Sequence, residues 1–471
     1  MRDVYLLLNR AFLFPIAEKI GRTSIIEDYK RLKKSEWLTR DDLLKLQNEK
    51  LIKLVHHCYD NVPYYRKMFN SLSILPKDIE TSEDLSKIPV LTKELIRENY
   101  EQLISAGSDL RRSRLHSTGG STGAPLQYLS DNRTWSFSWA STFRAWSSFG
   151  FHFGEKIFTI GGNSLVNKTM SLTKKDMFEK LLMRNYKRSS AEMRAVDMAL
   201  HYRYLMRYKP VAIRGYPSAI YVIAKFIAET GLLAPKIKMV LTTGEVLLPA
   251  YRAKIQEVFQ VPIYDSYGAG DGGIASYECY MHEGLHVCEE RCVLEILDKD
   301  HNTIKDGAVG HVISTDLENY SFPFLRYQVG DMSYFKSDFC SCGRKSKLLG
   351  EVMGRNGKLL HSKSGVPISP TMLPIMLYPN SDYQDTNNQK LYNRIDRFQI
   401  RQFDTGDLVI YLKMKQPIDV DVKLYDYVID NYKKHFVGSN IKLSFVQNIP
   451  PLPSGKEDYV ISEFKPNNPS V

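Results

Sequence analysis

A run of glycine and hydroxyl residues is the stretch of this chain best suited to hold an anion. It reads Ser117, Thr118, Gly119, Gly120, Ser121, Thr122, Gly123, Ala124 and Pro125. Its glycines and closing proline disfavour a helix or a central strand, so we predict an exposed loop whose backbone N–H groups can wrap a phosphate. The run matches neither the Walker A pattern nor the Gly-x-Gly-x-x-Gly of dinucleotide sites. A flexible Ser/Gly surface loop is the alternative on this segment alone.

Three further polar clusters each follow a predicted buried strand. They are Gly215 to Ser218, Thr242 to Glu245, and Tyr264 to Asp271. Each cluster alone is more typical of a turn than of a site. Because open α/β sheets bind ligands beyond the carboxyl ends of their strands, the three together predict a site along one sheet edge.

Alternating strand-like and helix-like segments must position these clusters. Strand patterns at 156–160, 211–214, 239–242 and 262–264 alternate with helical patterns at 191–208, 219–230 and 251–259, which predicts βαβ units and a parallel sheet. Helical spacing also covers 40–70, where the pattern stops at Asn61-Val62-Pro63, and 135–149. The aromatic residues of 135–149 favour a core helix over the wall of an acyl pocket.

Short strands at 293–297 and 311–314 predict a mainly antiparallel β subdomain beyond Tyr280. A boundary near Gly354 separates an N-terminal domain, 1–354, from a small module, 355–471. In the module, strands at 398–403 and 408–414 flank a turn, and a helix at 420–435 precedes a strand at 442–446. The predicted fold class is α/β, with a large N-terminal domain of parallel and antiparallel sheets and a small α+β C-terminal domain.

In their order along the chain, the motifs resemble those of the adenylate-forming enzymes. The resemblance is to the branch that contains the phenylacetate–coenzyme A ligases and the CapK proteins of capsular polysaccharide biosynthesis. The glycine run resembles the phosphate loop of that family, and 243–245 and 264–271 resemble its nucleotide motifs. The likeness covers nearly the whole chain, through 61–66, 85–93, 284–286, 326–331, 354–355 and 453–456.

The resemblance implies an AMP-forming ligase. ATP would activate a small carboxylic acid to an acyl-adenylate with release of pyrophosphate, and the acyl group would pass to the thiol of coenzyme A or to an amine of a surface polysaccharide precursor. The alternative is a catalytically silent nucleotide-binding homologue that serves as a scaffold in polysaccharide assembly.

The family pattern also assigns roles to residues of this chain. Residues 117–123 would hold the phosphates of ATP, and Asp331 would accept hydrogen bonds from the ribose hydroxyls. Arg355 would reach the ribose or phosphate where a mobile C-terminal lid joins, and Lys456 would place a cation at the reacting groups. The rest of the nucleotide site would be Gly244, Glu245, Asp265, Ser266, Tyr267 and Gly268, and Tyr216 and Gly268 would contact the acid.

Three positions depart from the family pattern. Asp271 stands where relatives carry the glutamate that holds Mg²⁺, so the charge is kept while the side chain loses one methylene. Ala124 replaces a lysine of the phosphate loop, which leaves backbone and hydroxyl groups as the donors. Gly357 replaces a hinge aspartate, and glycine tolerates the large φ/ψ changes of a domain rotation.

A second group of residues has the chemistry of a metal site. Cys340 and Cys342 form a short hook, with Cys279 and His286 upstream. Two thiolates of a hook joined by Cys and His from a distant hairpin suit tetrahedral Zn²⁺, so a structural zinc ion is one hypothesis and reduced, buried thiols are the other. His282 and Cys288 are alternative ligands.

Composition describes a folded protein of 471 residues with 43% hydrophobic and 25% charged residues. The net charge of +11 favours anionic partners, but no aromatic-basic motif indicates nucleic acid. No apolar run is long enough to span a bilayer and no cleavage site follows the N-terminus, so a cytoplasmic location is expected. A peripheral membrane contact through residues 1–35, which are rich in Arg and Lys, stays open, as does the oligomeric state.

Overall fold

The computed structural model of the chain describes most of its residues. They are 4–109, 113–117, 126–162, 181–190, 195–247, 249–352, 360–363, 367–368, 373, 395–414, 422–449 and 460–464. Among the described residues, no helix combines the length and the apolar character that crossing a membrane requires.

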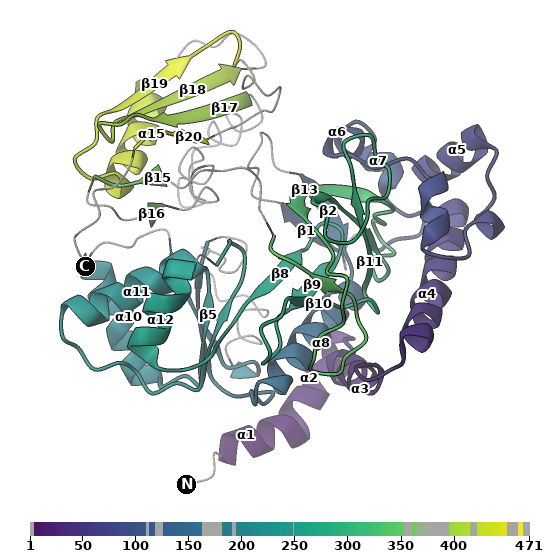
Figure 1. Ribbon diagram of the computed structural model, residues 1–471, viewed down its shortest axis with the longest axis horizontal. Coiled ribbons are helices and arrows are strands. Elements are labelled where there is room, and N and C mark those ends of the chain that lie inside the picture. Colours follow the sequence, from purple (N-terminus) through teal and green to yellow (C-terminus); the bar gives the residue numbers. More distant parts are fainter. Residues whose placement is uncertain are drawn as a thin grey trace.

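A five-stranded parallel sheet forms one side of the N-terminal part (Figure 1). Its strands lie in the order β4 (Asn185–Ser189), β3 (Ile157–Gly161), β5 (Ala212–Gly215), β6 (Met239–Thr242) and β7 (Ile263–Tyr264). On one face, Phe158, Ile213 and Val240 pack against α10 (Ala195–Tyr208), α11 (Pro217–Glu229) and α12 (Pro249–Phe259). On the other, Ile157 and Ala212 pack with residues of α8 (Asn132–Ser148). Burial on both faces explains why β3 and β6 are mainly apolar and buried along their whole length.

Antiparallel strands make up a second region of the same part. One sheet has the order β14 (Leu348–Leu349), β10 (Leu285–Val287), β9 (Ile274–Tyr277) and β8 (Ser266–Ala269). Another consists of β11 (Cys292–Leu297), β12 (Gly310–Asp316) and β13 (Tyr327–Ser333), and β1 (Arg114–Ser117) pairs with β2 (Gln127–Ser130). The predicted antiparallel subdomain is confirmed, but it begins at β8, before the change of character that the sequence shows at Tyr280.

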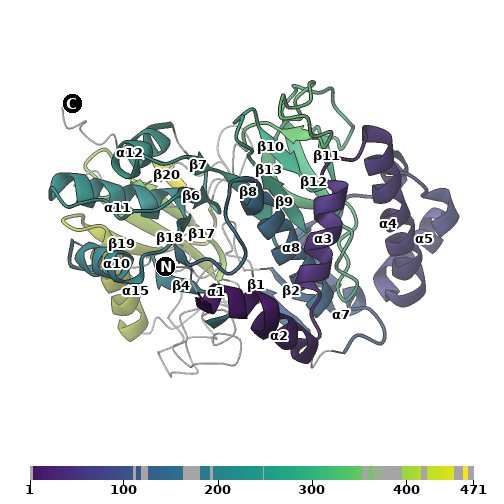
Figure 2. The ribbon, with the colours of Figure 1, turned by 90° about the horizontal axis from the view of Figure 1, so that it is seen from below.

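Helices cover the outside of these sheets. The first are α1 (Val4–Leu8), the π-helix η1 (Asn9–Leu13), α2 (Phe14–Gly21) and α3 (Ile25–Ser35). Next come α4 (Arg40–Asn61) and α5 (Pro63–Leu72), which confirm the predicted break before Pro63. The short helices η2 (Pro76–Asp78), η3 (Glu83–Lys87), α6 (Lys93–Glu98) and α7 (Tyr100–Leu103) follow. Figure 2 shows α1 and α2 beneath the sheets and α4 and α5 at one end.

Side-chain caps begin several of these helices. Thr39 accepts a hydrogen bond from the backbone N–H of Asp42 at the start of α4, and Asp131 does the same for Thr134 at the start of α8. Each cap satisfies an N–H group that the helix itself leaves without a partner. In α8 the aromatic side chains of Phe137, Phe143 and Trp146 are buried, in agreement with a core helix.

The C-terminal module has its own hydrophobic core, formed by residues between Leu360 and Val460. Its sheet has the order β19 (Ile441–Phe445), β18 (Leu408–Met414), β17 (Ile395–Gln402) and β20 (Val460–Ser462), packed with α15 (Val422–His435). A short hairpin, β15 (Leu360–His361) and β16 (Pro367–Ile368), belongs to it. The predicted domain boundary at 354 lies outside the described residues and stays a prediction.

Candidate functional site

The carboxyl ends of β5 and β6 bring Tyr216 and Gly244 into direct contact. Tyr216 precedes α11, is buried, and donates its backbone N–H to the carbonyl of Ile160 at 3.1 Å. Gly244 has φ of +82°, and a Cβ placed on it would lie 2.6 Å from the Tyr216 ring. Glycine is therefore required here both by the backbone conformation and by the approach of the ring. The contact confirms that two of the predicted clusters meet at one sheet edge.

Asp265 ties the end of β7 to the end of β6. Its Oδ1 accepts a hydrogen bond of 2.6 Å from Thr242 Oγ1, and the hydroxyl of the adjacent Ser266 donates to the Thr242 carbonyl at 2.7 Å. Burial raises the pKa of the Asp265 carboxyl to about 7, although the Thr242 hydroxyl opposes the shift, and the negative charge of Glu278 raises it further. Asp265 therefore fixes the backbone that leads into the third cluster.

Tyr267 and Asp331 form a pair between two antiparallel sheets. Tyr267 lies in β8 and Asp331 in β13, and the tyrosine hydroxyl donates to Asp331 Oδ2 at 2.9 Å. Both residues are only partly buried, so they line an accessible surface. Two residues that the family pattern assigns to one nucleotide are thus neighbours across 64 positions of sequence.

Asp271 lies deeper than these two residues. It is buried, and its Oδ2 accepts a hydrogen bond of 2.9 Å from the Tyr327 hydroxyl. Beyond the effect of its burial, the pKa of Tyr128 is raised by the charges of Asp271 and Asp316, which places the three side chains near one another. The Asp271 carboxylate therefore belongs to a buried polar cluster rather than to an exposed loop.

Asp316 is a residue of this cluster that the sequence did not single out. Its side chain is fully buried, and among the described residues its Oδ2 has no hydrogen-bond partner. A Cβ on Gly273, which has φ of +71°, would collide with this carboxylate, so the glycines after Asp271 permit the approach. Burial raises the pKa of Asp316 to about 6, against the attraction of Arg291. In the sequence, Asp316 could have been recognised only by its position at the end of the strand predicted at 311–314.

The base of the glycine run is a hairpin. Ser117, the last residue of β1, is the pairing partner of Gln127 in β2. The next residue of β2, Tyr128, would collide through its hydroxyl with a Cβ on Gly270, so the hairpin adjoins the Asp271 cluster. The other residues predicted for the loop and for the lid lie outside the described residues: Thr118, Gly119, Gly120, Ser121, Thr122, Gly123, Ala124, Pro125, Arg355, Gly357 and Lys456.

Glu245 and Gly268 complete the predicted nucleotide residues. Glu245 Oε2 accepts hydrogen bonds from the Ser218 hydroxyl at 2.6 Å and from the Ser218 backbone N–H at 3.3 Å, at the start of α11. Gly268 lies in β8 and pairs with Ala275 of β9. Glu245 therefore lies beside the Tyr216 turn, while Gly268 continues the strand that carries Tyr267.

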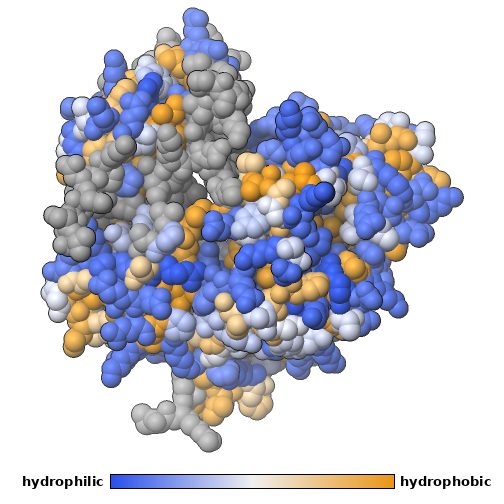
Figure 3. All heavy atoms as spheres, viewed as in Figure 1, coloured by the Kyte–Doolittle hydropathy of each residue, from blue (hydrophilic) through white to orange (hydrophobic). Residues whose placement is uncertain are grey.

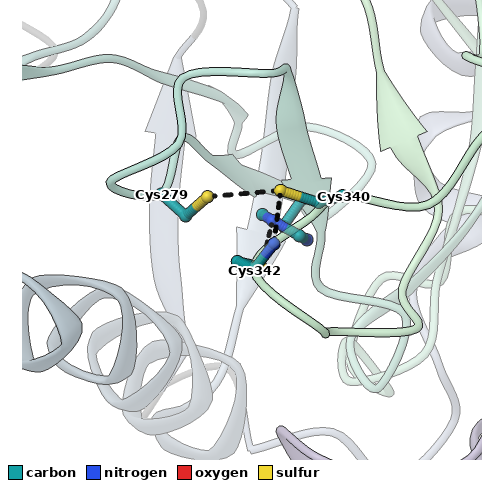
Figure 4. A group of neighbouring side chains, drawn as sticks. Cys279, Cys340 and Cys342 are labelled. Atoms are coloured by element: carbon teal, nitrogen blue, oxygen red, sulfur yellow. Dashed lines mark hydrogen bonds between the residues drawn. The ribbon is translucent and has the colours of Figure 1, made fainter.

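The four predicted zinc ligands converge in the interior. The ligand atoms of Cys279, His286, Cys340 and Cys342 lie within 4.8 Å of one another, and all four residues are buried. Figure 4 shows the sulfurs of Cys279 and Cys340 facing each other and the backbone N–H of Cys342 directed at the Cys340 sulfur; the two sulfurs are 3.5 Å apart. Cys342 Sγ lies 3.4 Å from His286 Nε2. Tetrahedral zinc sites separate two sulfurs by about 3.8 Å and a sulfur from a nitrogen by about 3.6 Å, so the cluster has the size of such a site.

Neighbouring groups lower the pKa of the Cys342 thiol and favour one tautomer of the imidazole, whereas burial raises the pKa of the Cys279 and Cys340 thiols. The backbone N–H of Met281 donates to Cys279 Sγ, and Arg344 donates to Cys342 Sγ, both at 3.4 Å. Such donors stabilise a negatively charged sulfur. His286 Nδ1 lies 3.0 Å from Ser346 Oγ, which leaves Nε2 directed at the cysteines.

The two alternative ligands lie elsewhere. The imidazole of His282 stacks on Tyr264 and its Nδ1 lies 3.2 Å from Glu278 Oε2. Cys288 donates to Glu290 Oε2 at 3.4 Å, and burial raises the pKa of its thiol to about 12. Neither belongs to the convergent group, so the geometry selects Cys279, His286, Cys340 and Cys342.

Comparison with known proteins shows which sequences and structures this chain resembles. No family model matches the chain. The phenylacetate–coenzyme A ligase of Thermus thermophilus is 25% identical over 362 residues, which cover 73% of this chain and 76% of the relative. The phenylacetate–coenzyme A ligase of Aromatoleum evansii is also 25% identical, over 73% of this chain and 77% of its own.

Comparison with solved structures identifies the fold of the chain. A crystal structure of 2-hydroxyisobutyryl-CoA ligase, in complex with 2-HIB-AMP and CoA, superposes with a TM-score of 0.65 at 17% identity and covers 92% of both chains. The same enzyme in its postadenylation state gives a TM-score of 0.59. The chain therefore has the fold of that ligase over nearly its whole length.

Proposed function

We propose that this chain, a phenylacetate–coenzyme A ligase-like member of the adenylate-forming ligases, activates a carboxylic acid with ATP. It would then transfer the acyl group to coenzyme A. The main supporting observation is that the Tyr216–Gly244 contact and Asp265 lie at the carboxyl ends of neighbouring strands of the parallel sheet, and that β8, which begins directly after Asp265, carries Tyr267 and its hydrogen bond to Asp331. The proposed domains are an adenylation core, 1–354, and a lid, 355–471.

The first half-reaction forms a mixed anhydride. A carboxylate oxygen of the acid attacks the α-phosphorus of ATP, the bond to the bridging oxygen breaks, and pyrophosphate leaves. In the second half-reaction the thiolate of coenzyme A attacks the acyl carbon and AMP leaves. In the first transition state negative charge builds up on phosphate oxygens. In the second it builds up on the acyl oxygen and on the phosphate of the departing AMP, so donors fixed in advance lower both barriers.

Each part of the nucleotide would be bound by a different group of residues. Asp331 would accept the two ribose hydroxyls, and Tyr267 holds its carboxylate in place through the 2.9 Å hydrogen bond. The adenine would lie beside Tyr267 and Glu245. Residues 117–123 would hold the phosphates, and Arg355 and Lys456 would approach from the lid. The acid would contact Tyr216, whose ring the close approach of Gly244 locks in position.

A magnesium ion fits the buried cluster around Asp271. The shortened side chain offers a carboxylate, and Asp316 carries a buried oxygen without a partner among the described residues. Carboxylate oxygens are the ligands that this hard cation prefers. Asp271 would hold the ion, with Asp316 next to it, and the bound cation would neutralise charge on the phosphates.

The net reaction distinguishes this function from its alternatives. Purified protein is incubated with ATP, Mg²⁺, coenzyme A and a panel of acids that starts with phenylacetate, and AMP and thioester are measured by mass spectrometry. The proposal expects AMP and acyl-CoA in equal amounts. AMP that accumulates only with a sugar amine, together with an amide product, would indicate the polysaccharide role. ATP binding without turnover on any acid would indicate a scaffold.

We also propose a structural zinc ion at Cys279, His286, Cys340 and Cys342. The convergence of the four buried ligand atoms supports it. The protein as purified is expected to hold about one zinc ion per chain, as tetrahedral sites of this composition do. The Cys342→Ser variant should lose the metal, whereas the matched variant Cys288→Ser should retain it, because Cys288 lies outside the group. A metal-free wild-type protein with three titratable thiols in this group would contradict the assignment.

A further inference from the structure

The N-terminal helical segment, α1–η1–α2, turns an apolar face to solvent. Its exposed large side chains are Val4, Tyr5, Leu7, Leu8, Phe12, Leu13, Ile16 and Ile20. Phe12 and Ile20 retain 60% and 79% of their surface. Figure 3 shows an apolar projection at the place where Figure 1 draws α1. Single exposed apolar residues are ordinary, but a continuous patch of this kind marks an interaction surface.

The opposite face fastens the segment to the body of the protein. Asn9 Nδ2 donates to the Leu182 carbonyl at 2.7 Å. Phe14 is fully buried, and the centroid of its ring lies 4.2 Å from the ring centroid of Phe153. The Glu18 carboxylate accepts the backbone N–H groups of Ile25 and Ile26 at the start of α3. These contacts fix the orientation of the segment, so the exposure of the apolar face is a property of the fold.

The π-helix sets the division between the two faces. In a π-helix, hydrogen bonds join residues five apart rather than four, so Asn9 and Phe14 lie one above the other on the inner side. Leu8, Phe12, Ile16 and Ile20 recur at intervals of four on the outer side. Leu181 extends the patch, because Tyr5 donates its hydroxyl to the Leu181 carbonyl and both side chains are exposed.

The charges around the apolar face are basic. Between residues 4 and 22 the exposed charged side chains are Lys19 and Arg22, while the one acid, Glu18, is buried against α3. A second copy of this chain would bring the same cations together across a twofold contact, with no exposed acid in the segment to pair with them. An apolar face edged by cations matches a surface of anionic lipid headgroups.

We propose that α1–η1–α2 lies in the plane of an anionic membrane surface, with Leu8, Phe12 and Ile16 inserted among the acyl chains and Lys19 and Arg22 at the phosphates. Such a helix binds through its buried apolar area and through attraction to the lipid charge, so both contributions are required. This binding site lies outside the proposed active site, and its test does not depend on ligase activity.

The test is co-sedimentation of the full-length protein with vesicles. Phosphatidylcholine vesicles with about one third phosphatidylglycerol are compared with pure phosphatidylcholine, since the cationic edge requires lipid charge. Wild-type protein should bind the anionic vesicles, and salt should weaken the binding. The double variant Phe12→Ser/Ile16→Ser should reduce the partition coefficient by at least about tenfold, and Lys19→Ser/Arg22→Ser should also reduce it.

A matched control distinguishes binding through this segment from nonspecific adsorption through any exposed apolar side chain. Leu233 is 80% exposed and lies outside the segment, so Leu233→Ser should bind vesicles as the wild type does. Thermal melting of each variant verifies that it is folded, which is expected because the replaced side chains are exposed. Three results would overturn the proposal: no vesicle binding, equal binding to neutral vesicles, or a wild-type dimer in light scattering that Phe12→Ser/Ile16→Ser converts to a monomer.

Discussion

Replacement of Gly244 by alanine is expected to displace the Tyr216 ring and so to weaken binding of the acid. The new Cβ would lie 2.6 Å from the ring, well inside van der Waals contact, at a residue with φ of +82°. Tyr216 cannot retreat easily, because it is 4% exposed and packs in the core beside the parallel sheet. The strain must therefore be taken up by the ring, by the turn, or by both.

The size of the effect has two parts. A left-handed backbone costs a non-glycine residue about 1–2 kcal/mol. Overpacking of a filled site adds about 1–3 kcal/mol, so Gly244→Ala should destabilise the folded protein by about 2–5 kcal/mol. Gly231→Ala is the matched control. Gly231 has φ of +64°, but no atom lies within 4 Å of a new Cβ, so this variant should lose only the stability that the left-handed backbone costs.

Urea denaturation measures the stability of both variants, and acid-dependent pyrophosphate exchange at saturating ATP measures function. Because a misplacement of about 1 Å in a binding group can cost up to about 100-fold, Gly244→Ala should lower kcat/KM for the acid by about tenfold or more. The KM for ATP should rise less than the KM for the acid, because Gly244 and Glu245 belong to the proposed nucleotide site but the Tyr267–Asp331 pair is untouched. Equal stability of the two variants, or an equal rise of both KM values, would refute the reasoning.

Three further variants test single contacts. Asp265 is protonated in both folded and unfolded protein below pH about 4, and its folded pKa of about 7 makes the wild type lose up to about 4 kcal/mol of stability as pH rises from 4 to 7. Asp265→Asn lacks this loss. In urea titrations at several pH values, the free energy of unfolding of the variant should therefore rise relative to that of the wild type as pH rises; a difference in stability that does not change with pH would contradict the raised pKa. Tyr267→Phe removes a half-exposed hydrogen bond to Asp331 worth about 1 kcal/mol, so the KM for ATP should rise about fivefold with the KM for the acid unchanged. Lys456→Ala should slow pyrophosphate exchange by about 100-fold or more, whereas Lys434→Ala, an exposed lysine of α15, should not; equal rates would remove Lys456 from the reaction.

Local patterns predicted much of the fold for clear physical reasons. Strands buried on both faces, such as β3 and β6, are mainly apolar. Pro63 ends one helix and begins the next because it lacks an N–H donor. The Tyr216 and Gly244 clusters could be assigned to one edge because the carboxyl ends of parallel strands coincide. The four zinc candidates were recognisable from chemistry alone.

Contacts between distant segments could not be predicted in this way. The choice of His286 over His282 depends on how β10 faces the loop of Cys340, since both histidines have the same ligand chemistry. Asp316 resembles any polar residue at a strand end until the fold places it against Gly273. The apolar N-terminus was visible, but its inner and outer faces follow from the π-helix and from the contacts of Asn9, Phe14 and Glu18, which no local pattern encodes.

Exchange of labelled pyrophosphate into ATP tests the central claim most directly, because it reports acyl-adenylate formation without any acceptor. The acid panel is supplied one compound at a time, with Mg²⁺ and without coenzyme A. We expect exchange that depends on at least one carboxylic acid and that falls when Asp331 is replaced by alanine while the folded state is retained. Absence of exchange with every acid in the wild-type protein, under conditions where ATP binds, would contradict it.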